Sequence, residues 1–515
     1  MAENSAAAQE IAAGYTTTGK ALELGTVVVD GTVDPSAKVR IPLAMLNRHG
    51  LVAGATGTGK TKTLQALAGQ LSDAGVPVVL ADVKGDLSGL AQAGQANDKV
   101  TQRSTDTGDD WAPTAYPVQF MSLGTGGTGV PIRATITGFG PILLSKVLGL
   151  NETQESTLGL IFHWADQKGL PLLDTKDLRS VIQHLTSDAG KADLQGIGGV
   201  SASTAGVILR SLSNLEAQGG EDFFGEPELA VADLIRQAEG SDRVRGMVTL
   251  LELDNLQAKP QLFSTFLMWL LAELFQELPE AGDLDAPKLV FFFDEAHLLF
   301  DNASKAFLDQ IEQTVKLIRS KGVGVFFCTQ LPTDVPNAVL SQLGARVQHA
   351  LRAFTPEDQK ALSQTVKTYP TTPHYKLDKA LTSLGIGEAI VTVLSEQGAP
   401  TPVAWTRLRA PRSLMGPIGA DAVKQAAAAS DLHGKYAETV DRESAYEMMA
   451  NKAAPAQEGA PAEAPEQQEA PRDKDDPGFA EKVMGNPAVK SFFRSAASSI
   501  GREVTRSLFG TRRRR

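Results

Sequence analysis

The stretch HGLVAGATGTGKTKTLQAL, residues 49–67, places glycines, a lysine and a threonine at the spacing of a phosphate-binding loop. Glycines let backbone N–H groups turn inward around a phosphate, and the positive end of a helix dipole adds to the attraction. We expect Lys60 to reach the β- and γ-phosphates of ATP and the Thr61 hydroxyl to bind Mg²⁺. The residues predicted to bind the nucleotide are Gly54, Ala55, Thr56, Gly57, Thr58, Gly59, Lys60, Thr61 and Lys62.

Two carboxylates, Asp294 and Glu295, follow the apolar run KLVFFF. Such a run is typical of a parallel strand buried on both faces, and ligands bind at the carboxyl ends of such strands. We therefore predict that Asp294 binds Mg²⁺ and that Glu295 polarises the water that attacks the γ-phosphate. The alternative is an acidic cap on the following helix, and the phosphate loop elsewhere in the chain disfavours it. We predict no catalytic role for His297.

Further polar residues are candidates for the same site. Gln330 ends the next apolar run, where an amide can sense the γ-phosphate. Arg319 is our candidate for an arginine finger, a residue that neutralises charge in the transition state and often comes from a neighbouring subunit. Arg346 and Arg352 compete with it for that role, and for each arginine an exposed structural position is the alternative.

Asp82 and Lys84 follow another apolar run. They would lie at the same edge of a parallel sheet, where they contact either the nucleotide or a neighbouring subunit. An ordinary pair of loop residues explains them equally well.

These residues need a scaffold, and the apolar runs predict its strands at 76–85, 116–123, 288–293, 322–330, 345–354 and 387–394. Their alternation with helical stretches predicts an α/β fold with a doubly wound, mostly parallel sheet. Residues 141–284 have a helical pattern and separate the two ATP motifs. One of its helices is expected to begin after a cap at Asn151.

The predicted divisions of the chain follow from these patterns. They are an N-terminal extension with short strands at 1–39, the first part of the ATPase core at 40–140, a helical insertion at 141–284, the second part of the core at 285–412, a helical extension at 413–450, a disordered Ala/Pro/Glu linker at 451–476 and a basic amphipathic tail at 477–515.

The tail has an apolar residue every four positions from Phe492 to Leu508, with arginines beside them and at its end. An anionic membrane surface, DNA phosphates, and the protein's own core or a protein partner are three alternatives for what it contacts.

The composition is that of a soluble globular protein, with 42% apolar and 21% charged residues. A net charge of −11 argues against a surface that coats nucleic acid, so any such contact requires a local basic patch. The single cysteine, Cys328, excludes an internal disulfide framework. The N-terminus lacks the pattern of a signal peptide, and the apolar run 262–275 is too short and interrupted to cross a bilayer, so we expect a cytoplasmic protein.

The letters DEAH at 294–297 also name a class of helicases. In that class the acidic strand follows the phosphate loop closely, and a second complete RecA-like domain follows. Here a long insertion separates Lys60 from Asp294, and we expect no second domain after 412. The spelling is therefore a coincidence over a hydrolysis site.

The chain resembles the bacterial HerA-like ATPases of the HerA/FtsK group, most closely the YjgR branch, from about residue 20 to 415. The resemblance rests on GATGTGKT, DVKGDLSGL, GPILLSKVLGLNETQES, STFLMWLLAELFQELPE and FFFDEAHLLF. It implies a RecA-like P-loop NTPase, and better-known members form hexameric rings that move double-stranded DNA. It also implies the roles given above for Lys60, Thr61, Asp294, Glu295 and Gln330, and Arg319 matches the place of the finger.

Ring-forming HerA proteins carry a β-barrel ahead of the core, where this chain has short strand-like pieces such as GTVVVDG at 25–31. Two functions therefore remain open. One is an ATP-driven motor, helicase-like or translocase-like, that acts on double-stranded DNA as a homo-oligomer. The other is an ATPase that switches or remodels a protein partner, near the membrane or elsewhere, without DNA.

Overall fold

The structure is a computed structural model that describes residues 2–194, 198–239, 243–253, 260–300 and 305–453. Residues 1–453 form one compact unit. The predicted linker from 454 onward and the basic tail lie outside the described residues. Within the described residues no helix is long and apolar enough to cross a membrane.

One large sheet forms the centre of this unit, with strand order β2-β1-β14-β13-β12-β3-β11-β10-β4-β9-β5-β6. From β12 to β6 every neighbouring pair is parallel, whereas β13, β14, β1 and β2 add in antiparallel fashion. The strands are β1 Ala21–Val29, β2 Thr32–Pro42, β3 Gly50–Ala53, β4 Val78–Asp82, β5 Val118–Leu123, β6 Val130–Ile132, β9 Val248–Glu252, β10 Leu289–Phe293, β11 Val323–Thr329, β12 Ala345–Gln348, β13 Glu388–Thr392 and β14 Ala404–Leu408, and a separate hairpin holds β7 Gln237–Glu239 and β8 Val244–Gly246.

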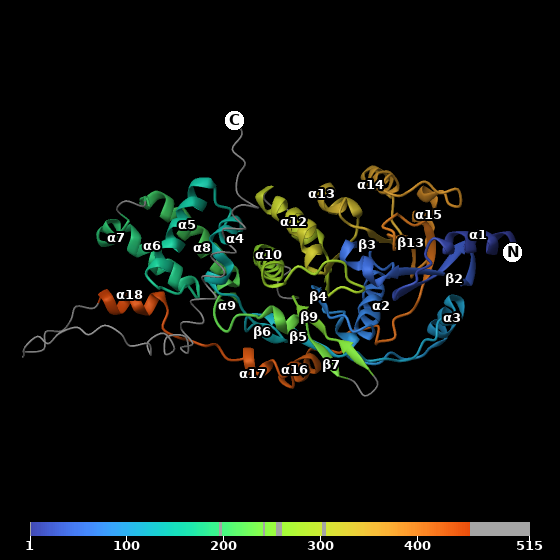
Figure 1. Ribbon diagram of the computed structural model, residues 1–515, viewed down its shortest axis with the longest axis horizontal. Coiled ribbons are helices and arrows are strands. Elements are labelled where there is room, and N and C mark those ends of the chain that lie inside the picture. The colour runs from blue at the N-terminus through green and yellow to red at the C-terminus, as the bar shows by residue number, and fades with distance from the viewer. Residues whose placement is uncertain (1, 195–197, 240–242, 254–259, 301–304, 454–515) are drawn as a thin grey trace, which may run out of the picture. The chain divides into compact units, whose positions relative to one another are not determined.

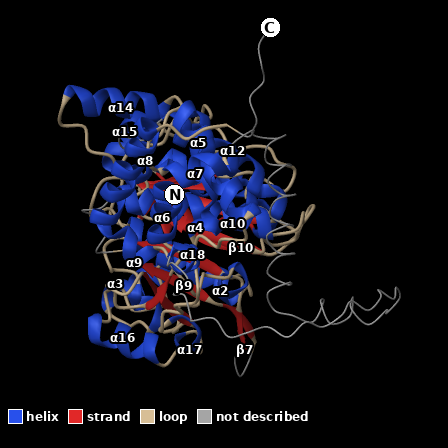
Figure 2. Cartoon of the chain, turned by 90° about the vertical axis from the view of Figure 1, so that its left-hand side faces the viewer, coloured by secondary structure: helices blue, strands red, loops and turns tan. Residues whose placement is uncertain are grey.

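Helices cover both faces of the sheet, with α12 and α14 above the strands in Figure 1 and α2 and α16 below them. In the side view the strands lie between blue helices (Figure 2). The helices are α1 Ala2–Ala13, α2 Lys60–Asp73, α3 Asp98–Thr107, α4 Ile136–Val147, α5 Glu152–Gln167, α6 Thr175–Thr186, α7 Asp188–Asp193, α8 Ala202–Leu215, α9 Glu221–Phe223, α10 Pro260–Glu277, α11 His297–Phe300, α12 Lys305–Ile318, α13 Asn337–Leu340, α14 Pro356–Val366, α15 Leu377–Ser383, α16 Ala420–Ala428, α17 His433–Tyr436 and α18 Ala445–Ala453.

The central strands are apolar throughout because both of their faces are covered. All five residues of β10 and all seven of β11 are buried, and two pairs of phenylalanine rings contact each other across these strands, one stacked and one tilted. This explains why these strands appear in the sequence as continuous apolar runs rather than as an alternating pattern. The predicted α/β fold with a mostly parallel sheet is confirmed.

The helical stretch between the two ATP motifs folds largely as its pattern predicts. Asn151 caps α5 and forms a reciprocal capping box with Gln154. Helices α4 to α8 pack on one another, at the left in Figure 1, and α10 joins this group to α12 of the core. The stretch also contains β9, a strand of the central sheet, which the helical pattern did not indicate. The predicted boundaries of the insertion remain a prediction.

Helix α10 carries a carboxylate, Glu273, in mostly buried surroundings. Burial raises its pKa to about 8, and the negative charges of Glu228 and Glu277 add to the rise. The folded state therefore holds this proton more tightly than the unfolded state, and the associated stability is lost as the pH rises from about 4.5 towards 8.

Glu273→Gln should remove that loss, because the amide cannot ionise. We expect a melting temperature equal to that of the wild type near pH 5 and a gain that grows up to pH 8, worth roughly 2–4 kcal/mol of unfolding free energy. Thermal melts between pH 5 and 9 measure this difference. Glu438→Gln, at an exposed position, is the control and should show no such trend. A gain independent of pH would contradict the assignment.

Candidate functional site

The phosphate loop connects β3 to α2 at the carboxyl edge of the parallel sheet. Gly54, Gly57 and Gly59 have φ values of 151°, 80° and 111°, so each needs the freedom of glycine. Gly59 precedes α2 and caps it with no side chain, so the first backbone N–H groups of this helix remain available to an anion. Lys60 donates from Nζ to the carbonyl oxygens of Gly54 and Ala55, at 2.6 and 3.3 Å, and thus lies over the loop.

A buried histidine packs against the phosphate loop. His349 follows β12, and a Cβ on Gly54 would lie only 2.5 Å from the His349 Cβ, so this glycine permits a close approach. Its Nε2 lies 3.0 Å from the Thr63 hydroxyl of α2. Burial lowers the pKa of His349 to about 4, and the charge of Lys60 adds to this, so the imidazole is neutral at pH 7. A neutral ring here adds no positive charge to that of Lys60.

The predicted acidic pair lies at the same edge of the sheet, directly after β10. Asp294 is 4% exposed; its Oδ1 accepts the Glu295 N–H at 3.0 Å, whereas its Oδ2 is buried and makes no hydrogen bond. Burial raises the pKa of Asp294, and the adjacent charge of Glu295 adds to the rise. Glu295 has φ 49°, an uncommon conformation for a residue with a side chain, which costs of order 1 kcal/mol and often marks functional sites.

An ion pair with Lys84 holds the Glu295 carboxylate in place, and His297 lies close to it without a hydrogen bond. Lys84, from the turn after β4, forms an ion pair with its Oε1. The His297 Nδ1 lies 3.3 Å from its Oε2. The carboxylate is only 7% exposed, so the ammonium compensates a negative charge that burial would otherwise disfavour. The predicted contacts of Lys84 with the nucleotide or a neighbouring subunit remain predictions, and in the structure this lysine pairs with Glu295.

The turn after β4 brings two more carboxylates to this edge. Asp82 is fully buried and accepts the N–H groups of Lys84, Gly85 and Leu87, at 3.2, 2.8 and 2.9 Å. Burial raises the pKa of Asp82 to about 7, and the charges of Asp86 and Asp294 add to the rise. One oxygen from each of Asp82, Asp86 and Asp294 lies within 4.8 Å of the others. Three oxygens at this spacing suit a hard divalent cation.

Gln330 and Arg352 also lie at the phosphate loop. Gln330 follows β11 with an exposed side chain, and its carbonyl oxygen accepts the Gly54 N–H at 3.1 Å. Arg352 follows β12 and donates to the Thr56 carbonyl oxygen at 3.3 Å. Arg346 instead lies within β12 and donates to the carbonyl oxygens of Thr368 and Leu340, at 2.9 and 3.4 Å.

Arg319 lies at the opposite edge of the sheet. It precedes β11, whose other end, at Thr329, pairs with Ala53 beside the phosphate loop. The length of that strand, roughly 20 Å, exceeds the reach of an arginine side chain. The structure therefore does not bring Arg319 to the site of its own chain. As a finger it would have to act on a neighbouring subunit.

The family described as "Helicase HerA-like C-terminal" matches residues 29–515. The chain belongs to this HerA-like family. A search of curated proteins found no significant match. Assignment to the YjgR branch remains a prediction.

Solved structures with the same fold are proteins of distant sequence. The bacterial conjugative coupling protein TrwBdeltaN70, in its unbound monoclinic form, is 15% identical with a TM-score of 0.51, over 79% of this chain and 94% of that one. Its trigonal form, in complex with sulphate, gives 15% identity and a TM-score of 0.50, over 80% and 94%. VirB4 of Thermoanaerobacter pseudethanolicus is 15% identical with a TM-score of 0.46, over 75% and 97%. The two TrwBdeltaN70 matches support the predicted RecA-like P-loop NTPase fold of the HerA-like chain.

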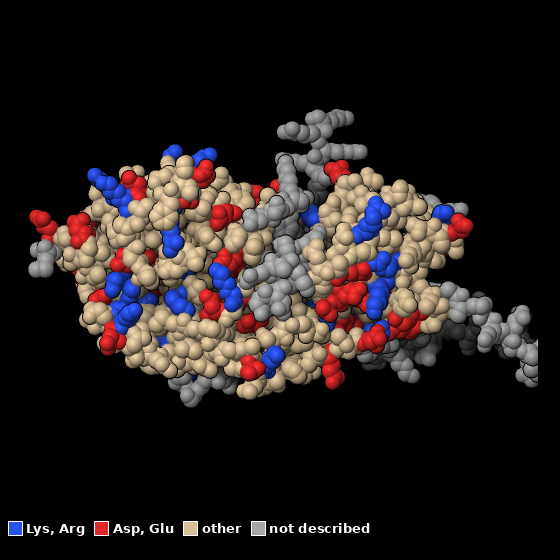
Figure 3. All heavy atoms as spheres, turned by 180° about the vertical axis from the view of Figure 1, so that it is seen from behind, with Lys and Arg blue, Asp and Glu red and all other residues tan. Residues whose placement is uncertain are grey.

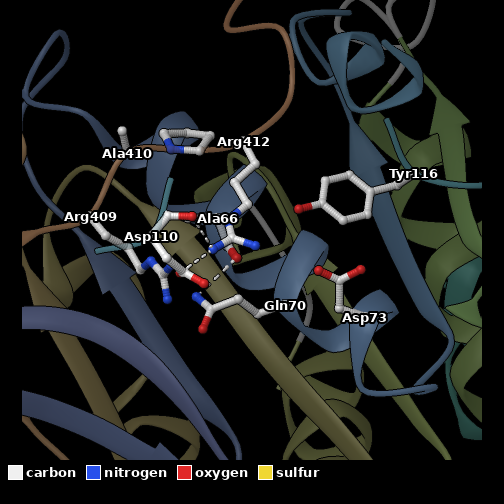
Figure 4. Close-up of a pocket in the computed structure, with 9 residues that line it drawn as sticks. Ala66, Gln70, Asp73, Asp110, Tyr116, Arg409, Ala410 and Arg412 are labelled. Atoms are coloured by element: carbon white, nitrogen blue, oxygen red, sulfur yellow. Dashed lines mark hydrogen bonds and ion pairs between the residues drawn. The ribbon is translucent and has the colours of Figure 1, made fainter. Parts of the chain in front are cut away.

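A recess away from the phosphate loop does not have the properties of a ligand site. It lies beside α2 and between the segments 110–116 and 409–412 (Figure 4). Its arginines are already neutralised, since Arg409 pairs with Asp109 and Arg412 with Asp110. Its volume of about 110 Å³ is smaller than that of a typical ligand pocket. We assign these residues to the stability of the fold.

Two residues at the HerA-like site were missed by the sequence analysis. Asp86 had a signal, because Asp82 and Asp86 stand four apart in the stretch DVKGD, but a turn pattern does not say which strand lies beside it. His349 had none, because its contact with α2 depends on the pairing of β12 with β3.

Proposed function

We propose that the protein hydrolyses ATP at the carboxyl edge of its parallel sheet. The observation that carries this proposal is the placement of Glu295 at the same edge as the phosphate loop, although a long insertion separates the two in sequence. The uncapped N–H groups of α2 and the ammonium of Lys60 suit a triphosphate. The residues proposed to contact it are those of the loop, from Gly54 to Lys62.

Mg²⁺ fits the residues that are present. Asp294 offers a buried oxygen without a partner, and Thr61 offers a hydroxyl on the first turn of α2. Oxygen ligands of this kind are those that Mg²⁺ prefers. When bound, the ion would supply positive charge to the phosphate oxygens. The proposed metal ligands are therefore Thr61 and Asp294.

The chain's own residues account for the remaining chemistry. Glu295 is oriented by its ion pair with Lys84 and is proposed to accept a proton from the attacking water. Lys60 leaves its carbonyl partners and donates to the phosphates, because a phosphate oxygen is the stronger acceptor. Gln330, whose side chain is exposed at the end of β11, is proposed to sense the γ-phosphate. Arg319 completes the site only if a second copy of the chain supplies it.

We propose further that hydrolysis drives movement along double-stranded DNA in a homo-oligomer, a hexamer by analogy with ring-forming HerA proteins. Membership of the HerA-like family supports this, as does the position of Arg319 at the edge opposite its own phosphate loop. In a ring of subunits, an arginine at that edge can reach the phosphate loop of the neighbouring subunit.

Switching of a protein partner is the second candidate, and the surface charge favours it. The net charge is −11, and the face seen in Figure 3 has acidic side chains interspersed among the basic ones. A protein that holds DNA usually presents a basic stripe. Neither proposal depends on the C-terminal tail. Its predicted contacts remain DNA, an anionic membrane or a protein.

Steady-state ATP hydrolysis with and without double-stranded and single-stranded DNA tests the proposal. A motor on DNA predicts stimulation by double-stranded DNA that weakens as salt rises, because phosphate contacts release counterions. A rate unaffected by either DNA would contradict the DNA motor and favour a protein partner. No hydrolysis with or without DNA would contradict the proposed ATPase itself.

Oligomerisation has its own test in the same assay. Arg319→Ala mixed with an excess of Lys60→Ala subunits should regain activity, because the wild-type Arg319 of one copy then completes the site of another. Arg48→Ala, at a neighbouring arginine of the same edge, is the control for a general charge effect. Failure of the mixture to regain activity would contradict a finger donated between subunits.

A further inference from the structure

The carboxylates of Asp82, Asp86 and Asp294 form a cluster that catalysis by Glu295 does not explain. Asp82 ends β4 and Asp294 follows β10, and the two strands pair so that Phe293 lies opposite Ala81. This register places Asp294 beside Asp82. One oxygen of each aspartate lies within 4.8 Å of the others.

The turn after β4 has the geometry of a ligand-bearing loop. Asp82 accepts three backbone N–H groups from residues 84, 85 and 87, and this folds the chain back so that Asp86 reaches the same place. Each carboxylate oxygen has two lone pairs, so these bonds leave acceptor capacity on Asp82. The turn is therefore fixed before any ion arrives.

Unpartnered buried oxygens point to a missing ligand. Asp294 is 4% exposed, and its Oδ2 makes no hydrogen bond. The Oδ1 of Asp86 is likewise buried without a partner. A buried carboxylate oxygen without a donor costs roughly 1–3 kcal/mol or more, so two of them in one cluster call for a positive group between them.

The charges of Lys62 and Lys84 act on the cluster from a distance, but neither ammonium bonds one of its carboxylates. Lys84 forms its ion pair with Glu295, and Lys62 donates to the Gln65 side chain at 3.1 Å. Among the described residues, no lysine or arginine forms an ion pair with any of the three aspartates. Within the described part of the chain, the three carboxylates thus have no directly bonded cation.

We infer that Asp82, Asp86 and Asp294 bind a divalent cation of the Mg²⁺ or Mn²⁺ class in the absence of nucleotide. The all-oxygen donor set selects hard cations, and Mg²⁺ keeps several waters when a few carboxylates hold it. Binding of this cation does not depend on the proposed function, whereas its role in ATP hydrolysis rests on that function. The protein would enter the ATPase cycle with a cation already beside Asp294.

Mn²⁺ serves as the probe because its electron paramagnetic resonance signal reports the free ion directly. The full chain without nucleotide should bind Mn²⁺, and added Mg²⁺ should displace it. Asp86→Asn should weaken Mn²⁺ affinity by about 10- to 100-fold. Asp188→Asn is the matched control, because Asp188 is fully exposed on α7 and should leave the affinity unchanged.

The outcomes separate this inference from the proposed function. Wild-type protein that binds no Mn²⁺ without nucleotide would overturn the inference, as would Asp86→Asn that binds as the wild type does. Mn²⁺ binding that depends on Asp86 in a protein that never hydrolyses ATP would support the inference and contradict the proposed ATPase. A circular dichroism melt of Asp86→Asn should match the wild type, and Asp86→Glu, which keeps the charge, should retain most of the affinity.

Discussion

Glu295→Gln should lower the rate of ATP hydrolysis by about 10²- to 10⁴-fold and leave ATP binding within a few-fold of the wild type. The substitution keeps the size of the side chain and removes the group that accepts a proton. It also removes the ion pair with Lys84, which lies outside the phosphate loop. Binding should therefore persist while turnover stops.

Phosphate release and nucleotide affinity, measured on the same preparation, test this expectation. Glu357→Gln is the control, because Glu357 is an exposed residue in the first turn of α14. Turnover within about twofold of the wild type would contradict the role of Glu295 as the base. The unusual φ of Glu295 gives a second check, since glutamine at φ 49° carries the same backbone cost and should melt at a similar temperature.

Lys60→Ala has the second large effect, on affinity rather than on turnover alone. The ammonium group would donate charge-assisted hydrogen bonds to the phosphates, and the loss of these should weaken ATP binding by roughly 100-fold. In the structure the same ammonium bonds the carbonyl oxygens of Gly54 and Ala55. Its removal leaves these two carbonyl oxygens without that donor, so stability without nucleotide has to be measured separately from affinity.

Titration with a fluorescent ATP analogue measures this loss of affinity. Lys176→Ala on the exposed side of α6 is the matched control and should bind as the wild type does. Equal affinities for the Lys60→Ala and wild-type proteins would show that the nucleotide does not use this loop. A lower melting temperature for Lys60→Ala without nucleotide would instead indicate a structural role for the lysine.

Some of the predicted features depend only on short stretches of sequence. Lys60 and Asp294 were assigned from short motifs whose glycines, lysine and carboxylates act within one turn or strand end. The helix after Asn151 was assigned for the same reason, because its capping box spans only a few residues. The mostly parallel sheet followed from the continuous apolar runs, since burial on both faces leaves no alternation.

Other features depended on contacts between distant segments. Strand β9 was missed because its five residues lie in a stretch with a helical pattern. Arg319 fits the sequence spacing of a finger, yet the direction of β11 places it at the edge away from its own phosphate loop. The ion pair of Lys84 with Glu295 requires β4 to lie beside β10.

The sequence by itself predicted the phosphate loop and the acidic pair. Each of these motifs is a short stretch of consecutive residues, so its residues are neighbours in the folded chain as well. Only the tertiary structure decided which further groups join them. The order of the strands brings Asp86 to Asp294 and His349 beneath Gly54, and it keeps Arg319 away. Strand order is set by the packing of the whole sheet, so no local stretch of sequence records it.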